Sequence, residues 1–225
     1  MTQTPGGKRA ANRTRNRILD ASLRLFNEFG APAVTTNRIA DELDISPGNL
    51  HYHFRHKEDI VLELFQRFER SIGELMGAAE QDLRGVADLW LYVHFTFERV
   101  QEFRFLFRDQ SELVAVYPSL RTRMQRQIER SIGVIRSFIG RLADQRVLLA
   151  SDEEMDALAL NMSIVSNYWF NLDGVRSAGR SAASPEHGHS AARGVFQVLS
   201  LVTPHLRGRT RKAFGELALR YVAEH

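Results

Sequence analysis

Residues 45–54, with the sequence ISPGNLHYHF, concentrate side chains that can form hydrogen bonds with DNA bases and with phosphate oxygens. The amide of Asn49 can pair with both N6 and N7 of adenine, and the imidazole of His51 can donate to or accept from a base edge. Tyr52 and His53 carry donors suited to phosphate oxygens, whose contacts position a protein on DNA without reading its sequence. These residue types predict a surface that enters the major groove.

The residues that precede and follow these side chains are also suited to a helix that contacts DNA. Ser46 is a favourable helix N-cap, Pro47 suits the first helical position, and Gly48 allows close approach to a base pair. Thr36 can offer its hydroxyl and backbone N–H to the same DNA strand from the start of the preceding helix. Lys57 lies near a helix N-terminus, where the dipole disfavours a cation unless a phosphate is bound.

Each of these residues also has an ordinary structural interpretation when taken alone. Asn49 is then an exposed polar residue, Tyr52 a half-buried core tyrosine, and Lys57 a solvated lysine. Their order on two short helices, expected at residues 36–43 and 47–54, favours the DNA interpretation. Three residues separate these helices, which is helix-turn-helix spacing, and the second helix of such a pair enters the major groove.

The elements that would hold this site are helical, and the whole chain is expected to be all-α. Apolar residues recur at helical spacing over residues 18–29, and Gly30 would end that helix. Ile60, Leu64 and Phe68 mark one face of a further, long helix in the same region. Further helices are expected over residues 87–108, 118–143, 152–173, 190–205 and 208–223. Between them, the small and polar residues 173–191 are typical of an exposed, mobile loop.

Length, composition and charge narrow the class of protein. The 225 residues suffice for one ordinary domain or for a small domain fused to a larger one. The net charge of +3 is unevenly spread: residues 1–57 carry nine Lys or Arg against five Asp or Glu, whereas residues 58–204 carry sixteen against twenty. A basic N-terminal part is compatible with a polyanion partner and equally with a solvated surface, and residues 8–17 can either follow a phosphate backbone or lie in solvent.

The sequence offers no motif for catalysis or for a cofactor. It lacks Gly-x-Ser-x-Gly, a P-loop, the dinucleotide-binding glycine pattern and His-Glu-x-x-His. It has no cysteine, and His51 and His53 are too close along a helix to face one another as metal ligands. We therefore expect no enzyme activity, no cofactor and no metal. Residues 1–17 lack the apolar stretch of a secretory signal, and no membrane helix is apparent, so a cytoplasmic protein is expected.

The segment TTNRIADELDISPGNLHYHFRHKEDI resembles the helix-turn-helix signature of TetR-type, or AcrR-type, bacterial transcriptional regulators over about residues 13–72. Two positions depart from the common pattern: Asp44 replaces the usual glycine of the turn, and His51 replaces the commoner tyrosine. Asp tolerates the left-handed conformation that the turn requires. The departure at His51 puts the base preference in question, while the fold is unaffected.

The resemblance implies a homodimeric regulator that binds a palindromic double-stranded DNA operator under the control of a small ligand. It divides the chain into a three-helix DNA-binding domain, residues 12–72, and a helical ligand-binding and dimerisation domain, residues 73–225. The DNA-binding residues that it implies are Thr36, Ser46, Pro47, Gly48, Asn49, His51, Tyr52, His53 and Lys57. Repressors and activators share such a DNA-binding domain, so either role is open.

The C-terminal part is rich in aromatic residues, which either pack as a core or line an apolar ligand cavity. Residues 161–172 are apolar nearly all round, as in a helix buried on two sides. The residues that a cavity would use are Trp90, Phe95, Phe103, Phe107, Phe138, Asn167 and Trp169. Residues 73–225, which we call the body, resemble PhaD-type regulators in residues 98–113 and 201–225. Such regulators are linked to polyhydroxyalkanoate gene clusters.

That second resemblance implies a ligand from fatty-acid metabolism, such as an acyl-CoA. Arg104 and Arg108 can meet a carboxylate or phosphate of such a ligand, or can be solvated or paired with acids. An alternative function for the same aromatic body is a small-molecule carrier of acyl-CoA type. A DNA selection experiment would distinguish the carrier from the regulator.

Overall fold

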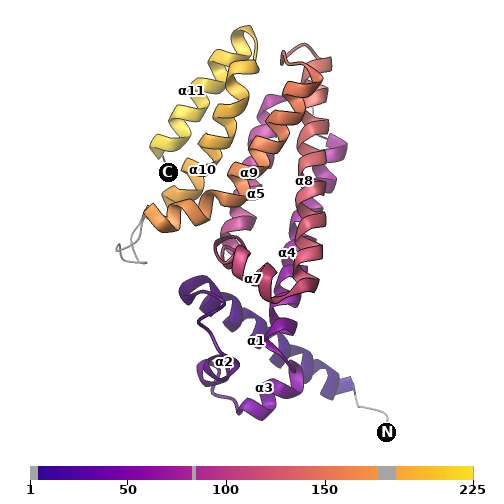
Figure 1. Cartoon of the computed structure of the whole chain (residues 1–225), viewed down its shortest axis with the longest axis vertical. Coiled ribbons are helices and arrows are strands. Elements are labelled where there is room, and N and C mark those ends of the chain that lie inside the picture. The colour runs from indigo at the N-terminus through magenta and orange to yellow at the C-terminus, as the bar shows by residue number, and fades with distance from the viewer. Residues whose placement is uncertain (1–4, 83–84, 177–185, 225) are drawn as a thin grey trace. The chain divides into compact units, whose positions relative to one another are not determined.

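The computed structural model describes residues 5–82, 85–176 and 186–224, and these residues are built from helices (Figure 1). The helices are α1 (Pro5–Phe29), α2 (Thr36–Glu42), α3 (Pro47–His53), α4 (Lys57–Asp82), α5 (Val86–Glu102), α6 (Phe105–Arg108), α7 (Gln110–Val116), α8 (Pro118–Asp144), α9 (Asp152–Arg176), α10 (Glu186–Val202), the short 3₁₀ helix η1 (Thr203–His205) and α11 (Gly208–Glu224). No strand occurs in the described ranges, where one isolated bridge pairs Leu148 with Leu206. The all-α expectation is confirmed.

The chain folds into two compact units. The first comprises the residues up to Phe68 together with Phe103–Thr122, and the second comprises Glu69–Glu102 and the residues from Arg123 onward. We expected a single boundary between residues 72 and 73. Helices α6 and α7, although central in the sequence, belong to the unit of α1–α3. The division into a DNA-binding domain and a ligand-binding domain stays a prediction.

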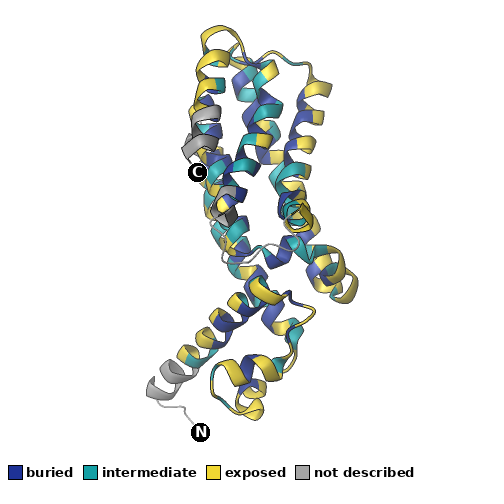
Figure 2. Ribbon diagram, turned by 90° about the vertical axis from the view of Figure 1, so that its left-hand side faces the viewer, coloured by how far each residue is buried: buried dark blue, intermediate teal, exposed yellow. Residues whose placement is uncertain are grey.

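The core of the first unit begins with the second half of α1. Ile18, Leu19 and Phe26 are fully buried, and the buried and exposed sides of α1 can be followed in Figure 2. The hydroxyl of Ser22 is buried on the same side and donates to the carbonyl of Ile18, at 2.7 Å. Gly30 ends the helix as expected, with φ +88° and its N–H bonded to the carbonyl of Phe26.

In the second unit α10 packs against α9, α5 and α11. The approach of α10 to its neighbours is close at Gly194, where an added Cβ would lie 2.1 Å from the Phe97 ring and 2.8 Å from Trp169. The indole N–H of Trp169 donates to the carbonyl of Ser190, at 2.8 Å, and ties α9 to α10. A glycine is therefore required here for packing.

Two helical expectations need correction. The helix expected over residues 87–108 is broken after Glu102, and α6 begins anew at Phe105, whose N–H donates to the side-chain oxygen of Asn27 at 3.1 Å. The loop expected over 173–191 is shorter, because α9 continues to Arg176 and α10 begins at Glu186; residues 177–185 lie outside the described part. None of the helices in the described ranges is both long enough and apolar enough to cross a bilayer.

Candidate nucleic-acid interface

The start of α2 is fixed by a side-chain cap. The hydroxyl of Thr35 accepts the N–H of Arg38 at 3.2 Å, which satisfies one of the free donors of the first turn. Thr36 is consequently the first residue of α2, where the sequence placed it. Ile39 and Ala40 are buried beneath this turn and hold α2 against its unit.

A tight turn joins α2 to α3. Asp44 adopts φ +52°, the left-handed conformation expected for this turn. Ser46 caps α3 by accepting the N–H of Asn49 at 3.1 Å, and Pro47 takes the first helical position, both as predicted. The Ser46 hydroxyl keeps its own proton free to donate to a phosphate oxygen.

The side chains of α3 divide cleanly between core and surface. Leu50 and Phe54 are 1% exposed and anchor the helix. Asn49 and His51 are exposed, and Tyr52 is 75% exposed, so Tyr52 is not a core residue. The described residues thus present an amide, an imidazole and a phenol on a capped helix.

The first turns of α2 and α3 border one shallow hollow of about 290 Å³. Its lining residues are Thr36, Asn37, Pro47, Gly48, Leu50 and His51. The structure therefore brings Thr36 together with the beginning of α3, as a shared DNA contact requires. Asn37 was missed from the sequence, although its position beside Thr36 in the first turn of α2 is the signal that could have identified it.

Gly48 is not required by the protein's own packing. A Cβ at this position would meet only the Ser46 hydroxyl, at 4.0 Å, and the backbone does not have positive φ. The open space above Gly48 is compatible with the close approach of a base pair, which was the reason for selecting it from the sequence.

The C-terminal end of α3 is held by Arg15 of α1. One guanidinium nitrogen donates to the carbonyl of His53 at 2.8 Å, and the guanidinium carbon lies 4.1 Å from the centre of the Phe54 ring. The same arginine is paired with Glu63 on α4. Desolvation, followed by the nearby charge of Arg15, lowers the pKa of His53. Arg15 was not singled out from the sequence, because its partners are distant along the chain.

Lys57 is the first residue of α4 and is half-buried. Its ammonium donates to the carbonyl of Pro32 at 3.4 Å and lies 5.9 Å from the Phe26 ring centre. Desolvation lowers the Lys57 pKa, and the charges of Glu112 and Asp109 oppose that shift. Two ammonium protons remain for a phosphate oxygen.

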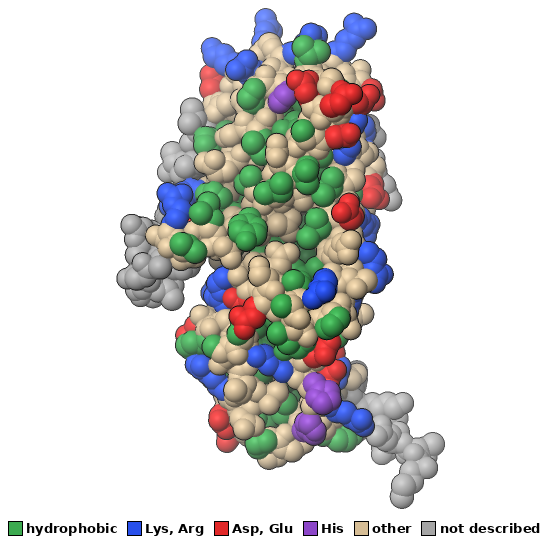
Figure 3. Space-filling model, in the orientation of Figure 1, with side chains coloured by type: hydrophobic (Ala, Val, Ile, Leu, Met, Phe, Trp, Pro, Cys, Tyr) green, Lys and Arg blue, Asp and Glu red, His purple; other side chains and the backbone are tan. Residues whose placement is uncertain are grey.

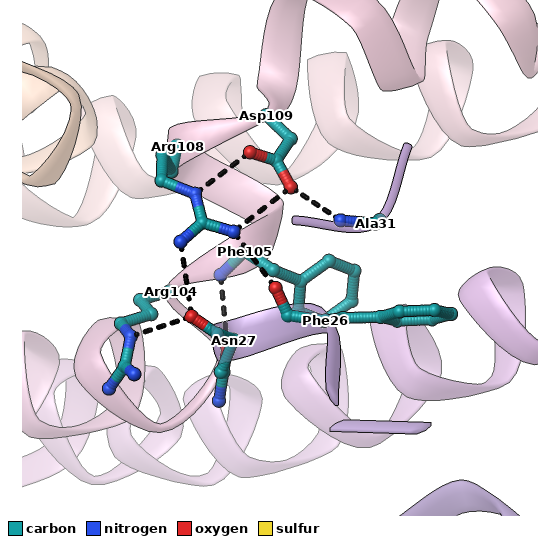
Figure 4. A network of polar contacts seen from close by, with 7 residues as sticks. All are labelled: Phe26, Asn27, Ala31, Arg104, Phe105, Arg108 and Asp109. Carbon is teal, nitrogen blue, oxygen red and sulfur yellow. Dashed lines mark hydrogen bonds and ion pairs between the residues drawn. The ribbon is translucent and has the colours of Figure 1, made fainter. Parts of the chain in front are cut away.

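A polar network joins α6 to the C-terminal end of α1 (Figure 4). Arg108 donates to the carbonyls of Phe26, at 2.9 Å, and Asn27, at 3.0 Å, in the last turn of α1. The Phe26 carbonyl also accepts the N–H of Gly30. Asp109 accepts the N–H of Ala31 at 2.8 Å and pairs with Arg108 at 2.9 Å. The guanidinium also carries a charge favourable to the helix dipole.

This network concerns Arg104 and Arg108, which were considered above as contacts for a carboxylate or phosphate of a ligand. Arg108 is committed to α1 carbonyls and to Asp109, and Arg104 donates to the carbonyl of Asn27 at 3.3 Å. Desolvation and the charge of Arg108 lower the pKa of Arg104. The sequence left open whether Arg108 binds a ligand or pairs with an acidic residue, and the structure shows it paired with Asp109.

The seven residues proposed for a ligand cavity are divided between the two units. Phe103 and Phe107 belong to the first unit, where their rings pack edge-on against Phe68 with centroids 5.8 and 5.4 Å apart. The other five lie in the second unit. Trp90 packs edge-on against Phe214 of α11, whereas Phe95 is 40% exposed.

The remaining three members occupy separate packing positions in the second unit. Phe138 of α8 is buried, with the Arg141 guanidinium 5.4 Å from its ring centre. Trp169 is buried against α10, and Asn167 donates to the carbonyl of Ser163 at 2.8 Å within α9. Five of the six aromatic rings are thus buried, which both the core and the cavity interpretation allow.

A different residue of the body has the character of a ligand contact. The hydroxyl of Tyr92 on α5 is buried and has no hydrogen-bond partner among the described residues, and desolvation raises its pKa to about 12. The hydroxyls of Ser131 and Thr96 lie near enough to oppose this shift, but neither has hydrogen-bond geometry to Tyr92; that of Thr96 donates instead to the Tyr92 carbonyl, at 2.7 Å. A buried donor without a partner is costly unless a ligand or a water satisfies it.

Comparisons with known proteins give a consistent result. The family profile "Bacterial regulatory proteins, tetR family" matches residues 18–64, and the profile "Bacterial transcriptional repressor" matches residues 67–214. The regulator AcrR of Shigella flexneri is 37% identical over 68 residues, which are 30% of this chain and 32% of AcrR. The chain thus matches only about a third of the length of that curated relative.

Solved structures extend the similarity to the whole fold. A TetR-family transcriptional regulator from Marinobacter aquaeolei VT8 is 32% identical, has a TM-score of 0.82, and is matched over 92% of this chain and 98% of its own. A putative regulator from Saccharomonospora viridis, solved with choline, is 22% identical with a TM-score of 0.65 over 81% of this chain and 94% of its own, and shares the fold. The family consists of transcriptional regulators and not of enzymes. On the two profiles and the Marinobacter structure, this chain belongs to the TetR family of bacterial regulatory proteins.

Proposed function

We propose that this protein is a transcriptional regulator that reads an operator in the major groove with α3. The observation that carries the proposal is the surface of that helix, which is capped at Ser46, anchored by two buried residues and yet exposes an amide, an imidazole and a phenol. Asn49 and His51 contact base edges, and Tyr52 and His53 contact phosphates. Thr36 and Asn37 join from α2 across the hollow that they share with His51.

The dimer that a palindromic operator requires forms through α9. Leu160, Ile164, Tyr168 and Leu172 recur every fourth residue, are 47–56% exposed, and form one apolar stripe with Val175. Figure 3 shows hydrophobic side chains gathered on the surface of this part of the body. A self-complementary stripe of this kind favours a two-fold dimer. In such a dimer the recognition helices sit roughly 34 Å apart, one turn of DNA.

The regulator acts as a repressor controlled by a small molecule. Repression is favoured by the description of the profile that matches residues 67–214, and a small-molecule effector is favoured by the choline complex of the Saccharomonospora relative. A reporter downstream of the operator, assayed with and without the protein, separates a repressor from an activator. An effector can release DNA only if it binds the free and DNA-bound states with different affinity.

An effector of acyl-CoA type, and with it control of fatty-acid or polyhydroxyalkanoate metabolism, is the more detailed proposal. It depends on the resemblance of the body to PhaD-type regulators. The buried Tyr92 hydroxyl offers a hydrogen bond to a polar group of such a molecule. A thermal-shift titration with acyl-CoAs of increasing chain length tests it. Stabilisation that is reduced in Tyr92→Phe supports the idea, and no stabilisation at any chain length refutes it.

The DNA-reading role is tested by selection from random duplex DNA, followed by titration of the enriched sequence. We expect an inverted repeat to be enriched. Asn49→Ala should then change the preferred bases, because its amide reads a base edge. Lys57→Ala should weaken binding to all sequences alike and flatten the salt dependence. Purely salt-driven binding without an enriched sequence would refute the proposal and favour the acyl-CoA carrier.

A further inference from the structure

Helix α1 carries mostly exposed residues ahead of the core of its unit. It begins at Pro5, and among its residues from Asn12 onward, whose side chains the structure describes, the first fully buried one is Ile18. We call residues 12–17 the extension. Residues 1–19 contain five cationic side chains and no acid, and the first carboxylate is that of Asp20. An isolated helix with this charge pattern is weakened by like-charge repulsion.

Two arginines on this extension have no ion-pair partner within the part of the chain that the structure describes. Arg13 and Arg17 lie one turn apart on α1 and are exposed, and neither makes an ion pair with another described residue. Arg15 lies between them in sequence but on the opposite side of the helix, because two residues turn an α-helix by about 200°. It is the residue that fixes α1 to α3 and α4.

The extension is continuous with the proposed DNA surface. The hydrogen bond from Arg15 to the carbonyl of His53 connects α1 directly to the C-terminal end of α3. In Figure 1 the ribbon of α1 runs towards the end of the unit at which α3 lies. DNA that lies against the exposed side of α3 therefore passes close to the extension.

We infer that the extension, residues 12–17 of α1, forms a second DNA contact, in which Arg13 and Arg17 bind backbone phosphates that flank the bases read by α3. The contact is electrostatic and independent of sequence, because arginine pairs with phosphate oxygens wherever the backbone passes. Binding also relieves the like-charge repulsion along α1. The inference depends on the proposed DNA-reading function and assigns to it a longer footprint than α3 alone would give.

The test compares the full-length wild-type protein with an Arg13→Ala/Arg17→Ala variant on the duplex obtained by selection. Arg209→Ala/Arg211→Ala is the matched control, since it removes two exposed arginines from α11 in the other unit. Affinity is measured by fluorescence anisotropy over a series of salt concentrations. Each lost phosphate contact should lower the slope of log affinity against log salt by about 0.9, or about 1.8 for each protomer.

A second measurement fixes where the contact lies. Base pairs that flank the inverted repeat are removed stepwise from each end of the duplex. Wild-type protein should lose affinity when the flanks are removed, whereas the Arg13→Ala/Arg17→Ala variant, already lacking the contact, should not. Circular dichroism checks that both variants keep their helix content.

The outcomes separate the inference from the function on which it depends. If the Arg13→Ala/Arg17→Ala variant keeps the wild-type salt slope and sensitivity to the flanks, the extension does not contact DNA. If Asn49→Ala nevertheless loses base preference, the proposed DNA-reading function is retained. An equal loss of slope in the α11 control would show a general charge effect and also overturn the inference. If wild-type protein prefers no duplex, the proposed function and the inference fail together.

Discussion

Replacement of Asp109 tests the network that joins α6 to α1. The Asp109 side chain is 12% exposed, accepts the N–H of the fully buried Ala31, and pairs with Arg108. In Asp109→Ala the Ala31 N–H loses its partner, which costs about 1–3 kcal/mol. The loss of the ion pair adds less, since Arg108 is 30% exposed and keeps the carbonyls of Phe26 and Asn27. We expect a total of about 2–3 kcal/mol.

Asp109→Asn should cost less than Asp109→Ala, about 1 kcal/mol, because the amide oxygen still accepts from Ala31 while the charge is lost. Urea unfolding followed by circular dichroism measures both changes. Hydrogen exchange at the Ala31 amide localises them and should accelerate most in Asp109→Ala. Glu112→Ala, a charge change at an exposed position nearby, serves as the control. A loss below about 0.5 kcal/mol in Asp109→Ala, the size of an ordinary surface substitution, would refute the reasoning.

Three further predictions concern the body, the dimer and pH. Gly194→Ala should destabilise the protein by about 1–3 kcal/mol, since its Cβ would lie 2.1 Å from the Phe97 ring, and a thermal-unfolding midpoint equal to wild type would contradict this packing. Ile164→Glu should convert dimer to monomer in sedimentation, whereas Glu153→Gln on the same helix should not, and a dimeric Ile164→Glu would exclude the α9 stripe. The pKa of His53 in the folded state lies below the ordinary histidine value of 6.5, so folding disfavours the protonated form. The stability that neutral His53 contributes is therefore fully present above pH 6.5 and is lost as the pH falls through the lowered pKa. His53→Gln should flatten this decline in urea unfolding measured between pH 7.5 and 5, and an unchanged profile would show that His53 does not contribute.

The features predictable from the sequence are those fixed by local interactions. The cap at Ser46, the proline after it and the turn at Asp44 depend on residues within one or two turns, and each is as expected. The burial of Leu50 and Phe54 follows from helical periodicity in the same way.

The features that the sequence did not reveal depend on distant partners. The helix expected over 87–108 is interrupted because Asn27, 78 residues away, accepts the N–H of Phe105. Arg15 acts on a carbonyl 38 residues away. Periodicity also could not assign Phe103 and Phe107 to the first unit, because an apolar ring has the same pattern whichever partner buries it.

The most direct test of the central claim is a base-preference profile for the wild-type protein and His51→Ala. Every single base-pair substitution of the selected inverted repeat is titrated against both proteins at one salt concentration. If α3 reads bases, the variant should lose discrimination at one symmetric pair of positions, where each mismatch costs wild type about 1–3 kcal/mol, and keep it elsewhere. Identical profiles for the two proteins, with equal affinity, would show that His51 does not face the bases and would contradict the placement of α3 in the groove.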